Sequence, residues 1–244
     1  TMFAITVFDD EEPEIICPAD ITVSNDAGEC GAEVEFEDAL VFDAQYYEGF
    51  ENPNFQMNTP VGWNEYTSTI DRVASGTNGI MSSAGSNHGV IDNVTTSDFT
   101  GVFSRIGGYH TDFGLGFKTT MDVYMDLTDP TVIGDTYGWD LSHSVSNQSG
   151  NHHRDYIFHT ASNASGNILV ATSNNTNFTR RNDLATLDHY EITTSGWYTY
   201  EWYFRDNGDG SLAVDMKLYD DAGTVVFSIT NNNPADDIVT IIGG

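Results

Sequence analysis

The segment Trp197-Tyr-Thr-Tyr-Glu-Trp-Tyr-Phe204 decides the fold class of this sequence. It is rich in the aromatic residues that favour β-strands, and its apolar residues alternate only loosely with polar ones. Such a run suits a strand that is buried on both faces near the middle of a sheet. Asp206-Asn-Gly-Asp-Gly210 follows it and predicts a tight turn, and residues 212–219 predict the next strand.

The same strand-like character recurs through most of the chain. Further runs lie at residues 99–106, 116–127, 139–145, 155–161, 168–172, 190–193 and 224–230. Turn signals such as Asp221-Ala-Gly223 separate these runs, and no helical i, i+3, i+4 stripe interrupts the series. Many strands without crossover helices predict an all-β protein built as an antiparallel sandwich or barrel.

The composition excludes several classes of function. The 244 residues include 37 acidic and 8 basic side chains, which gives a formal net charge of −29. Because a field of this sign repels phosphates, we expect no nucleic acid or anionic membrane as a partner. Aromatic residues make up 12% of the chain, which is too large a share for a disordered acidic tail. No stretch approaches the length of a membrane span.

The charge is unevenly distributed along the chain. Residues 1–71 contain 17 acidic side chains and no Lys or Arg, whereas residues 72–244 contain 20 acidic side chains and all 8 basic ones. Short strand-like runs in the acidic part fall at 3–8, 21–24 and 32–36. We therefore expect a small β-module at residues 1–40 and a larger one at residues 41–244. Since strand-like runs reach both ends, we also expect a fragment of a longer exported chain.

A dense acidic run follows the first predicted strand. Asp9, Asp10, Glu11, Glu12 and Glu14 place five carboxylates within six positions. Hard oxygen ligands at this density suit Ca²⁺, which binds six to eight oxygens. The sequence thus leaves two interpretations open, a structural Ca²⁺ site in a hinge and a solvated acidic linker.

The chain has two cysteines, Cys17 and Cys30. No nearby histidine or second cysteine pair completes a zinc signature around them. A local disulfide formed in an oxidising environment fits their spacing, and two buried free thiols are the alternative. The disulfide interpretation predicts an extracellular or cell-surface location.

Basic and imidazole side chains are concentrated in one part of this acidic chain. They are His143, His152, His153, Arg154, His159, Arg180, Arg181 and His189. Together they could bind an anionic or polyhydroxylated ligand, with arginine forks that hold carboxylate or sulfate. The structural alternative is pairing with nearby aspartates, namely Asp140, Asp155, Asp183 and Asp188. If the segment is extended, His153 and His159 share one face and His152 lies on the other.

The tryptophans raise the possibility of sugar binding, because aromatic faces pack on the C–H faces of sugar rings. Trp63 and Trp139 each follow a glycine in a loop-like context, which favours exposure, whereas we expect Trp197 and Trp202 in the core. The predicted ligand site combines Trp63, Trp139, His153, Arg154, His159, Arg180 and Arg181.

Three stretches near the N-terminus resemble the hyalin repeat, an immunoglobulin-like module found in tandem in extracellular adhesive proteins. They are Thr6-Val-Phe-Asp-Asp-Glu-Glu-Pro13, Ile16-Cys-Pro-Ala-Asp-Ile-Thr-Val23 and Asp26-Ala-Gly-Glu-Cys-Gly-Ala32. A full repeat carries further cysteines, which this chain lacks, so Cys17 and Cys30 would pair with each other in a partial module. The resemblance implies neighbouring repeats of the same longer chain as partners.

The later part of the chain is similar to the closing hairpins of laminin-G and concanavalin-like jelly rolls. The similarity rests on His153-Arg-Asp-Tyr-Ile-Phe-His159, Ser195-Gly-Trp-Tyr-Thr-Tyr200, Asp206-Asn-Gly-Asp-Gly-Ser211 and Leu218-Tyr-Asp-Asp-Ala-Gly-Thr-Val225. It implies a jelly-roll β-sandwich over residues 41–244, preceded by the immunoglobulin-like module, in a large bacterial surface protein.

The sequence therefore favours a non-enzymatic structural or adhesive segment of a secreted or cell-surface protein, one that binds extracellular glycan and is stabilised by Ca²⁺. The alternative is a polysaccharide-degrading enzyme that uses Asp122 and Asp126, which share a strand face. No Ser–His–Asp or Cys–His set carries a recognisable nucleophile motif, so catalysis is not expected.

Overall fold

A computed structural model describes residues 14–16, 40–42, 47–53, 63–66, 68–93, 101–104, 116–128, 138–146, 152–175 and 183–233. The chain divides into two compact units, Thr1–Tyr47 and Glu48–Gly244. This division falls later along the chain than the boundary at residue 40 that charge and strand spacing predict.

In the first unit, β1 (Glu14–Ile16) pairs antiparallel with β2 (Leu40–Phe42), and Glu14 lies opposite Phe42. Glu14, the last carboxylate of the predicted acidic hinge, is the first residue of this strand, and the other four carboxylates lie outside the described residues. The strands predicted at 3–8, 21–24 and 32–36 lie outside the described residues.

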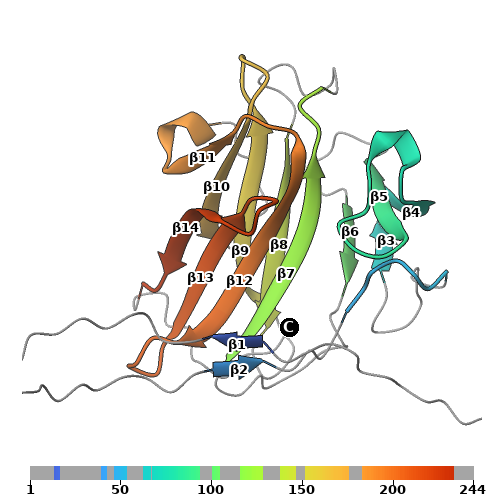
Figure 1. Cartoon of the computed structure of the whole chain (residues 1–244). Helices are drawn as coiled ribbons and strands as arrows, with labels where there is room; N and C mark the ends of the chain where they lie inside the picture. The colour runs from blue at the N-terminus through green and yellow to red at the C-terminus, as the bar shows by residue number, and fades with distance from the viewer. Residues whose placement is uncertain are drawn as a thin grey trace, which may run out of the picture. The chain divides into compact units, whose positions relative to one another are not determined.

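Two four-stranded antiparallel sheets dominate the second unit (Figure 1). The back sheet has the order β11-β10-β9-β8, and the front sheet has the order β14-β13-β12-β7. The back strands are β8 (Gly138–Ser146), β9 (His152–Ser162), β10 (Ile168–Asn175) and β11 (His189–Ile192). The front strands are β7 (Gly116–Met125), β12 (Gly196–Asp206), β13 (Leu212–Tyr219) and β14 (Val225–Asn231). The predicted all-β, antiparallel class is confirmed, and each of these strands overlaps a predicted run.

Two smaller antiparallel pairs precede the large sheets in the sequence. β3 (Trp63–Tyr66) pairs with β6 (Gly101–Ser104), and β4 (Ser68–Ala74) pairs with β5 (Asn87–Asn93). Short 3₁₀ turns are the only helical elements among the described residues, η1 (Thr77–Gly79) and η3 (Leu184–Thr186). No helix in this part of the chain is long and apolar enough to cross a membrane.

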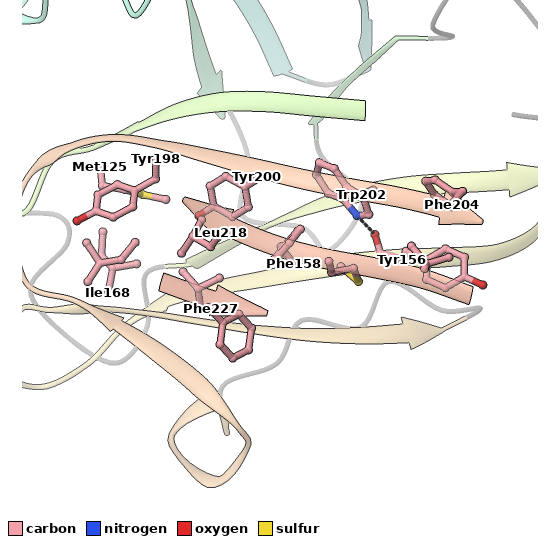
Figure 2. Close-up of a cluster of buried hydrophobic side chains, with 14 of the residues drawn as sticks. Met125, Tyr156, Phe158, Ile168, Tyr198, Tyr200, Trp202, Phe204, Leu218 and Phe227 are labelled. Carbon is pink, nitrogen blue, oxygen red and sulfur yellow. Dashed lines mark hydrogen bonds between the residues drawn. The ribbon is translucent and has the colours of Figure 1, made fainter. Parts of the chain in front are cut away.

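The inner faces of the front and back sheets share one aromatic core (Figure 2). Trp202, at 4% exposure, donates a hydrogen bond from Nε1 to the carbonyl oxygen of Tyr156 at 2.9 Å. Phe158 of the back sheet meets Tyr200 and Trp202 edge to face, with ring centroids 5.0 Å apart in both pairs. This geometry suits the quadrupoles of the rings, and it joins the two sheets through their central strands.

β12 lies in the middle of the front sheet, between β7 and β13, as its aromatic sequence predicts. The expectation that both of its faces are buried is only partly right. Its even-numbered residues from Tyr198 to Phe204 are buried, whereas Trp197 and Tyr203 on the other face keep part of their surface exposed. Trp202 is therefore a core residue as expected, and Trp197 is not.

The hairpin between β12 and β13 has the tight turn that its glycines predict. Gly208 and Gly210 adopt φ values of 88° and 84°, which are strained for any residue with a Cβ atom. Asp206 accepts a hydrogen bond from the backbone N–H of Gly208 at 2.6 Å. Residues 206–210 thus form the hairpin turn that the sequence predicts.

Gly138 allows close contact between β8 and β9, and we predict that Gly138→Ala is destabilising. A Cβ atom at this position would lie 2.6 Å from the backbone oxygen of Thr160 and 3.2 Å from the Cα atom of Ala161. Because backbone must shift to relieve this overlap, we expect a loss of about 1–3 kcal/mol in urea unfolding. Gly196→Ala is the matched control, since Gly196 also begins a strand and an added Cβ would meet nothing within 4 Å. Equal losses in the two variants would contradict the prediction.

Candidate functional site

Several residues predicted to bind ligands or metal, and the two cysteines predicted to form a disulfide, lie outside the described part of the chain. They are Arg180, Arg181, Asp9, Asp10, Glu11, Glu12, Cys17 and Cys30. Glu14 is placed in β1 by its backbone alone. Within the described residues, no group of three or more His, Cys, Asp and Glu side chains is arranged to hold a metal ion. The hinge and the disulfide remain predictions.

The two tryptophans expected in exposed loops lie in strands. Trp139 belongs to β8, packs against the shared core and approaches Tyr200 with ring centroids 6.2 Å apart. Trp63 begins β3 and stacks on Phe50 at 6.4 Å. Both indoles are half-buried rather than fully exposed, because Trp63 and Trp139 themselves belong to paired strands.

The basic residues of β9 do not gather into one pocket. His153 is exposed, and His159 is buried on the same face of the strand six residues later, which separates the two by about 20 Å. Because side chains alternate along a strand, Arg154 lies on the face that carries the core residues Tyr156 and Phe158.

Aspartates pair with two of the histidines instead. Nδ1 of His159 lies 2.9 Å from Oδ1 of Asp140, and Nε2 of His152 lies 2.9 Å from Oδ2 of Asp155. The structural alternative, in which nearby aspartates satisfy these side chains, is therefore confirmed for these two histidines.

The outer face of the front sheet combines aromatic and charged side chains, a set that sequence reasoning did not assemble. Strand alternation and the register of β7, β12 and β13 place these residues on the solvent side of the sheet. We call this surface the lysine face, and its residues are Lys118, Asp122, Tyr124, Trp197, Thr199, Glu201, Tyr203, Arg205, Asp215, Lys217 and Tyr219.

Glu201 forms the centre of the lysine face. Its carboxylate lies 3.8 Å from Nζ of Lys118 and 3.6 Å from Nζ of Lys217, which are the two lysines of the chain. The hydroxyl of Tyr219 donates to Oε1 of Glu201 at 3.0 Å. Glu201 is 6% exposed, so its negative charge is buried but compensated by two cations and a hydrogen bond.

A second ion pair lies toward the end of β12. Arg205 contacts Asp215 with two nitrogens, Nε at 2.7 Å and Nη2 at 3.1 Å, and Thr230 donates to the same carboxylate at 2.6 Å. Partial burial acts to raise the pKa of Asp215, but the hydrogen bonds from Arg205 and Thr230 outweigh it and hold that pKa below its usual value. The carboxylate therefore stays ionised and holds Arg205 against the sheet.

The aromatic end of the lysine face is also held in place. Trp197 meets Tyr124 edge to face at 5.5 Å, and its Nε1 donates to the carbonyl oxygen of Met81 at 2.7 Å. The ring of His88, on β5, lies edge-on to Trp197 at 6.2 Å. These contacts hold the indole in one orientation.

Comparison with known proteins finds no matching family model, no matching curated protein and no matching solved structure.

The two aspartates considered for glycoside cleavage have different surroundings. Asp122 lies on the lysine face and accepts a hydrogen bond from Thr199 at 2.6 Å. Asp126 follows the last residue of β7 and accepts bonds from the backbone N–H and the hydroxyl of Thr128 at 2.8 and 2.6 Å. Asp126 thus closes a local turn, a role that its position in the sequence did not indicate.

Proposed function

We propose that this chain is a glycan-binding, adhesive segment and that the lysine face is its binding surface. The single observation that carries the proposal is the arrangement of Trp197, Tyr124, Tyr203 and Tyr219 beside hydrogen-bonding charged groups on one face of a rigid sheet. Aromatic rings supply apolar contact to sugar C–H faces and the polar groups orient hydroxyls, which is the usual division of labour in ligand sites.

The charge of the lysine face supports this proposal. Lys118, Lys217 and Arg205 balance Glu201, Asp122 and Asp215, so the face carries a formal charge of zero in a chain of −29. Elsewhere the acidic surface repels an anionic polysaccharide, whereas this face does not. Both neutral and acidic glycans therefore remain acceptable ligands at the lysine face.

The domain types and the location of the protein are part of the same proposal. The two facing sheets are compatible with a jelly-roll sandwich of the laminin-G or concanavalin-like kind, and the first unit is compatible with a partial hyalin-type module. We propose that such modules join neighbouring repeats in a secreted or cell-surface protein and present the lysine face outward.

A glycan array followed by calorimetry on the best ligand tests the binding surface. We predict that Tyr203→Ala weakens binding about 10-fold, since it removes one stacking platform worth about 1.4 kcal/mol. Phe103→Ala, which truncates an aromatic side chain of β6 that is 44% exposed, is the control and should bind as the native chain does. Equal weakening in both variants, or an array without any ligand, would refute the proposal.

A calcium titration tests the expected hinge site independently. If Asp9, Asp10, Glu11, Glu12 and Glu14 bind Ca²⁺, added calcium should raise the melting temperature by several degrees, and a chelator should reverse the rise. Replacement of these five residues by Asn and Gln should abolish the effect and leave glycan binding unchanged. A melting temperature that does not respond to calcium would support the solvated linker instead.

A further inference from the structure

The outer face of the back sheet carries a Ser–His–Asp arrangement that the proposed binding function does not use. Nδ1 of His159 lies 2.9 Å from Oδ1 of Asp140, and Nε2 of His159 lies 2.7 Å from Oγ of Ser173. When the ring carries its proton on Nδ1, His159 donates to the carboxylate and accepts from the serine hydroxyl. This is the order of contacts in which a carboxylate orients an imidazole and the imidazole activates a hydroxyl nucleophile.

Three adjacent strands hold the triad rigidly. β8, β9 and β10 are neighbours in the back sheet (Figure 1). Asp140 on β8 lies directly opposite His159 on β9, and Ser173 on β10 is two residues from Ala171, the partner of His159. His159 is 1% exposed, whereas the side chain of Asp140 is 22% exposed and Ser173 is half-buried. His159 is therefore shielded from solvent, whereas Asp140 and Ser173 each keep part of their surface exposed.

The neighbourhood of His159 is apolar on one side. Leu184 of η3 packs with Ala161, Leu169 and Ala171, which lie on the same outer face of the back sheet. A low local dielectric strengthens the two hydrogen bonds of the imidazole. It also increases the effect of the Asp140 carboxylate on a positive charge that forms at His159.

A second polar cluster on the same face shows why the order of contacts matters. Ser144 donates to Asp155, and His152 contacts the other oxygen of that carboxylate at 2.9 Å. Here the aspartate lies between the other two groups, so no imidazole nitrogen accepts the serine proton. Ser144 has the same residue types around it as Ser173 but lacks a base, and it is a natural control.

β11 pairs with only the first part of β10. β11 pairs with β10 from Ile168 to Ala171 and ends there, two residues before Ser173. Among the described strands, none pairs with β10 on that side beyond Ala171. Because successive N–H groups of an extended strand point to opposite sides, we expect any backbone donor to an oxyanion to come from the stretch of β10 around Ser173.

We propose that Asp140, His159 and Ser173 form a hydrolytic triad that cleaves uncharged carboxylic esters. Oγ of Ser173 attacks the carbonyl carbon, and its proton passes to Nε2 of His159. His159 returns this proton to the alcohol oxygen as the C–O bond breaks, which leaves acylated Ser173. Water then attacks the acyl carbon and gives a proton to Nε2, and the released serine oxygen takes that proton back. The net reaction converts ester and water into acid and alcohol.

The charge of the chain sets the substrate class. Because the protein carries −29, it repels anionic esters such as phosphoesters and sulfate esters, and an uncharged ester approaches most freely. The acid product is an anion, and the same field favours its release.

Covalent labelling of the intact chain tests the proposal directly. We expect a fluorophosphonate probe to modify one serine, and peptide mass spectrometry to locate the added mass on Ser173. Ser173→Ala should abolish labelling and lower hydrolysis of p-nitrophenyl acetate at least 100-fold, whereas Ser144→Ala should leave both unchanged. Labelling at another serine, or no labelling of the native chain, would overturn the proposal.

Asp140 is a positioning residue in this scheme, and its variants separate positioning from folding. Asp140→Asn should lower kcat for p-nitrophenyl acetate at least 10-fold with little change in KM, and Asp140→Glu should recover part of the loss. Thermal unfolding of each variant, measured in parallel, identifies any loss that comes from misfolding. Equal kcat values for the native chain and a well-folded Asp140→Asn variant would show that Asp140 accepts a hydrogen bond from His159 but does not position it for catalysis.

Discussion

Trp202→Ala should lower the free energy of unfolding by about 3–5 kcal/mol, the largest stability effect we expect from one substitution. Trp202 is 4% exposed, lies on the central strand of the front sheet and meets Phe158 of the back sheet. Truncation would leave a cavity between the two sheets and remove the donor to the carbonyl oxygen of Tyr156. Urea unfolding followed by far-UV circular dichroism measures the loss.

Trp202→Phe separates the hydrogen bond from the packing. The phenyl ring keeps most of the apolar contact with Phe158 but cannot donate to Tyr156, so we expect a smaller loss of about 1–2 kcal/mol. If Trp202→Ala cost less than about 1 kcal/mol, the shared core between the two sheets would not be the main source of stability in this unit.

The native chain should lose about 2–3 kcal/mol of stability through His143 when the pH falls from 7.5 to 4.5. His143 lies on β8, and its ring packs near Phe117 and Phe204 at centroid distances of 5.5 and 4.6 Å. Burial lowers its pKa to about 4, from an ordinary value of 6.5. Part of the residue remains exposed, so we expect somewhat less than the full effect of this pKa difference.

The sign of the effect follows from proton binding. Between pH 6.5 and pH 4 the unfolded chain protonates His143 and the folded chain does not, so a falling pH favours unfolding. The contribution is complete above about pH 6.5 and is lost as the pH falls toward the folded pKa. Above this window the ring is neutral in both states and contributes no pH dependence.

His143→Phe isolates this contribution from the many carboxylates of the chain. The native protein and the variant share the same acidic groups, so the difference between their pH profiles reports His143 alone. We expect the variant to lose about 2–3 kcal/mol less than the native chain between pH 7.5 and pH 4.5. Parallel profiles would mean that the ring is hydrated in the folded state.

The sequence pattern predicted the large sheets well because the inward-facing residues of their strands are mostly apolar. Residues 212–219 alternate between buried and half-buried positions over most of their length, and the predicted strand matches β13. β4 and β5 were missed for the opposite reason. Of their described residues, Ser68, Ile70 and His88 are buried, which is too few to produce a period of two.

The candidate sites depend on strand register, which the sequence pattern does not contain. Glu201, Lys118 and Lys217 come from three strands, and their proximity follows from the pairing of β12 with β7 and β13. Asp140 and His159 were both considered for ion pairing, but Ser173 was not, since only the register of β9 and β10 places it beside the imidazole. Alternation predicts which face a residue occupies, and tertiary pairing decides its neighbours.

The order of strands in the two sheets has a consequence for how the chain folds. In the back sheet and in the β12–β14 part of the front sheet, each strand pairs with the next strand along the chain. Closing such short connections costs little entropy. The β7–β12 pair instead joins Met125 to Gly196, which are 71 positions apart, and the whole back sheet lies between them in the sequence. We expect this closure to limit the folding rate. Core substitutions on β9 and β13 should then mainly accelerate unfolding, whereas those at the β7–β12 contact should slow refolding.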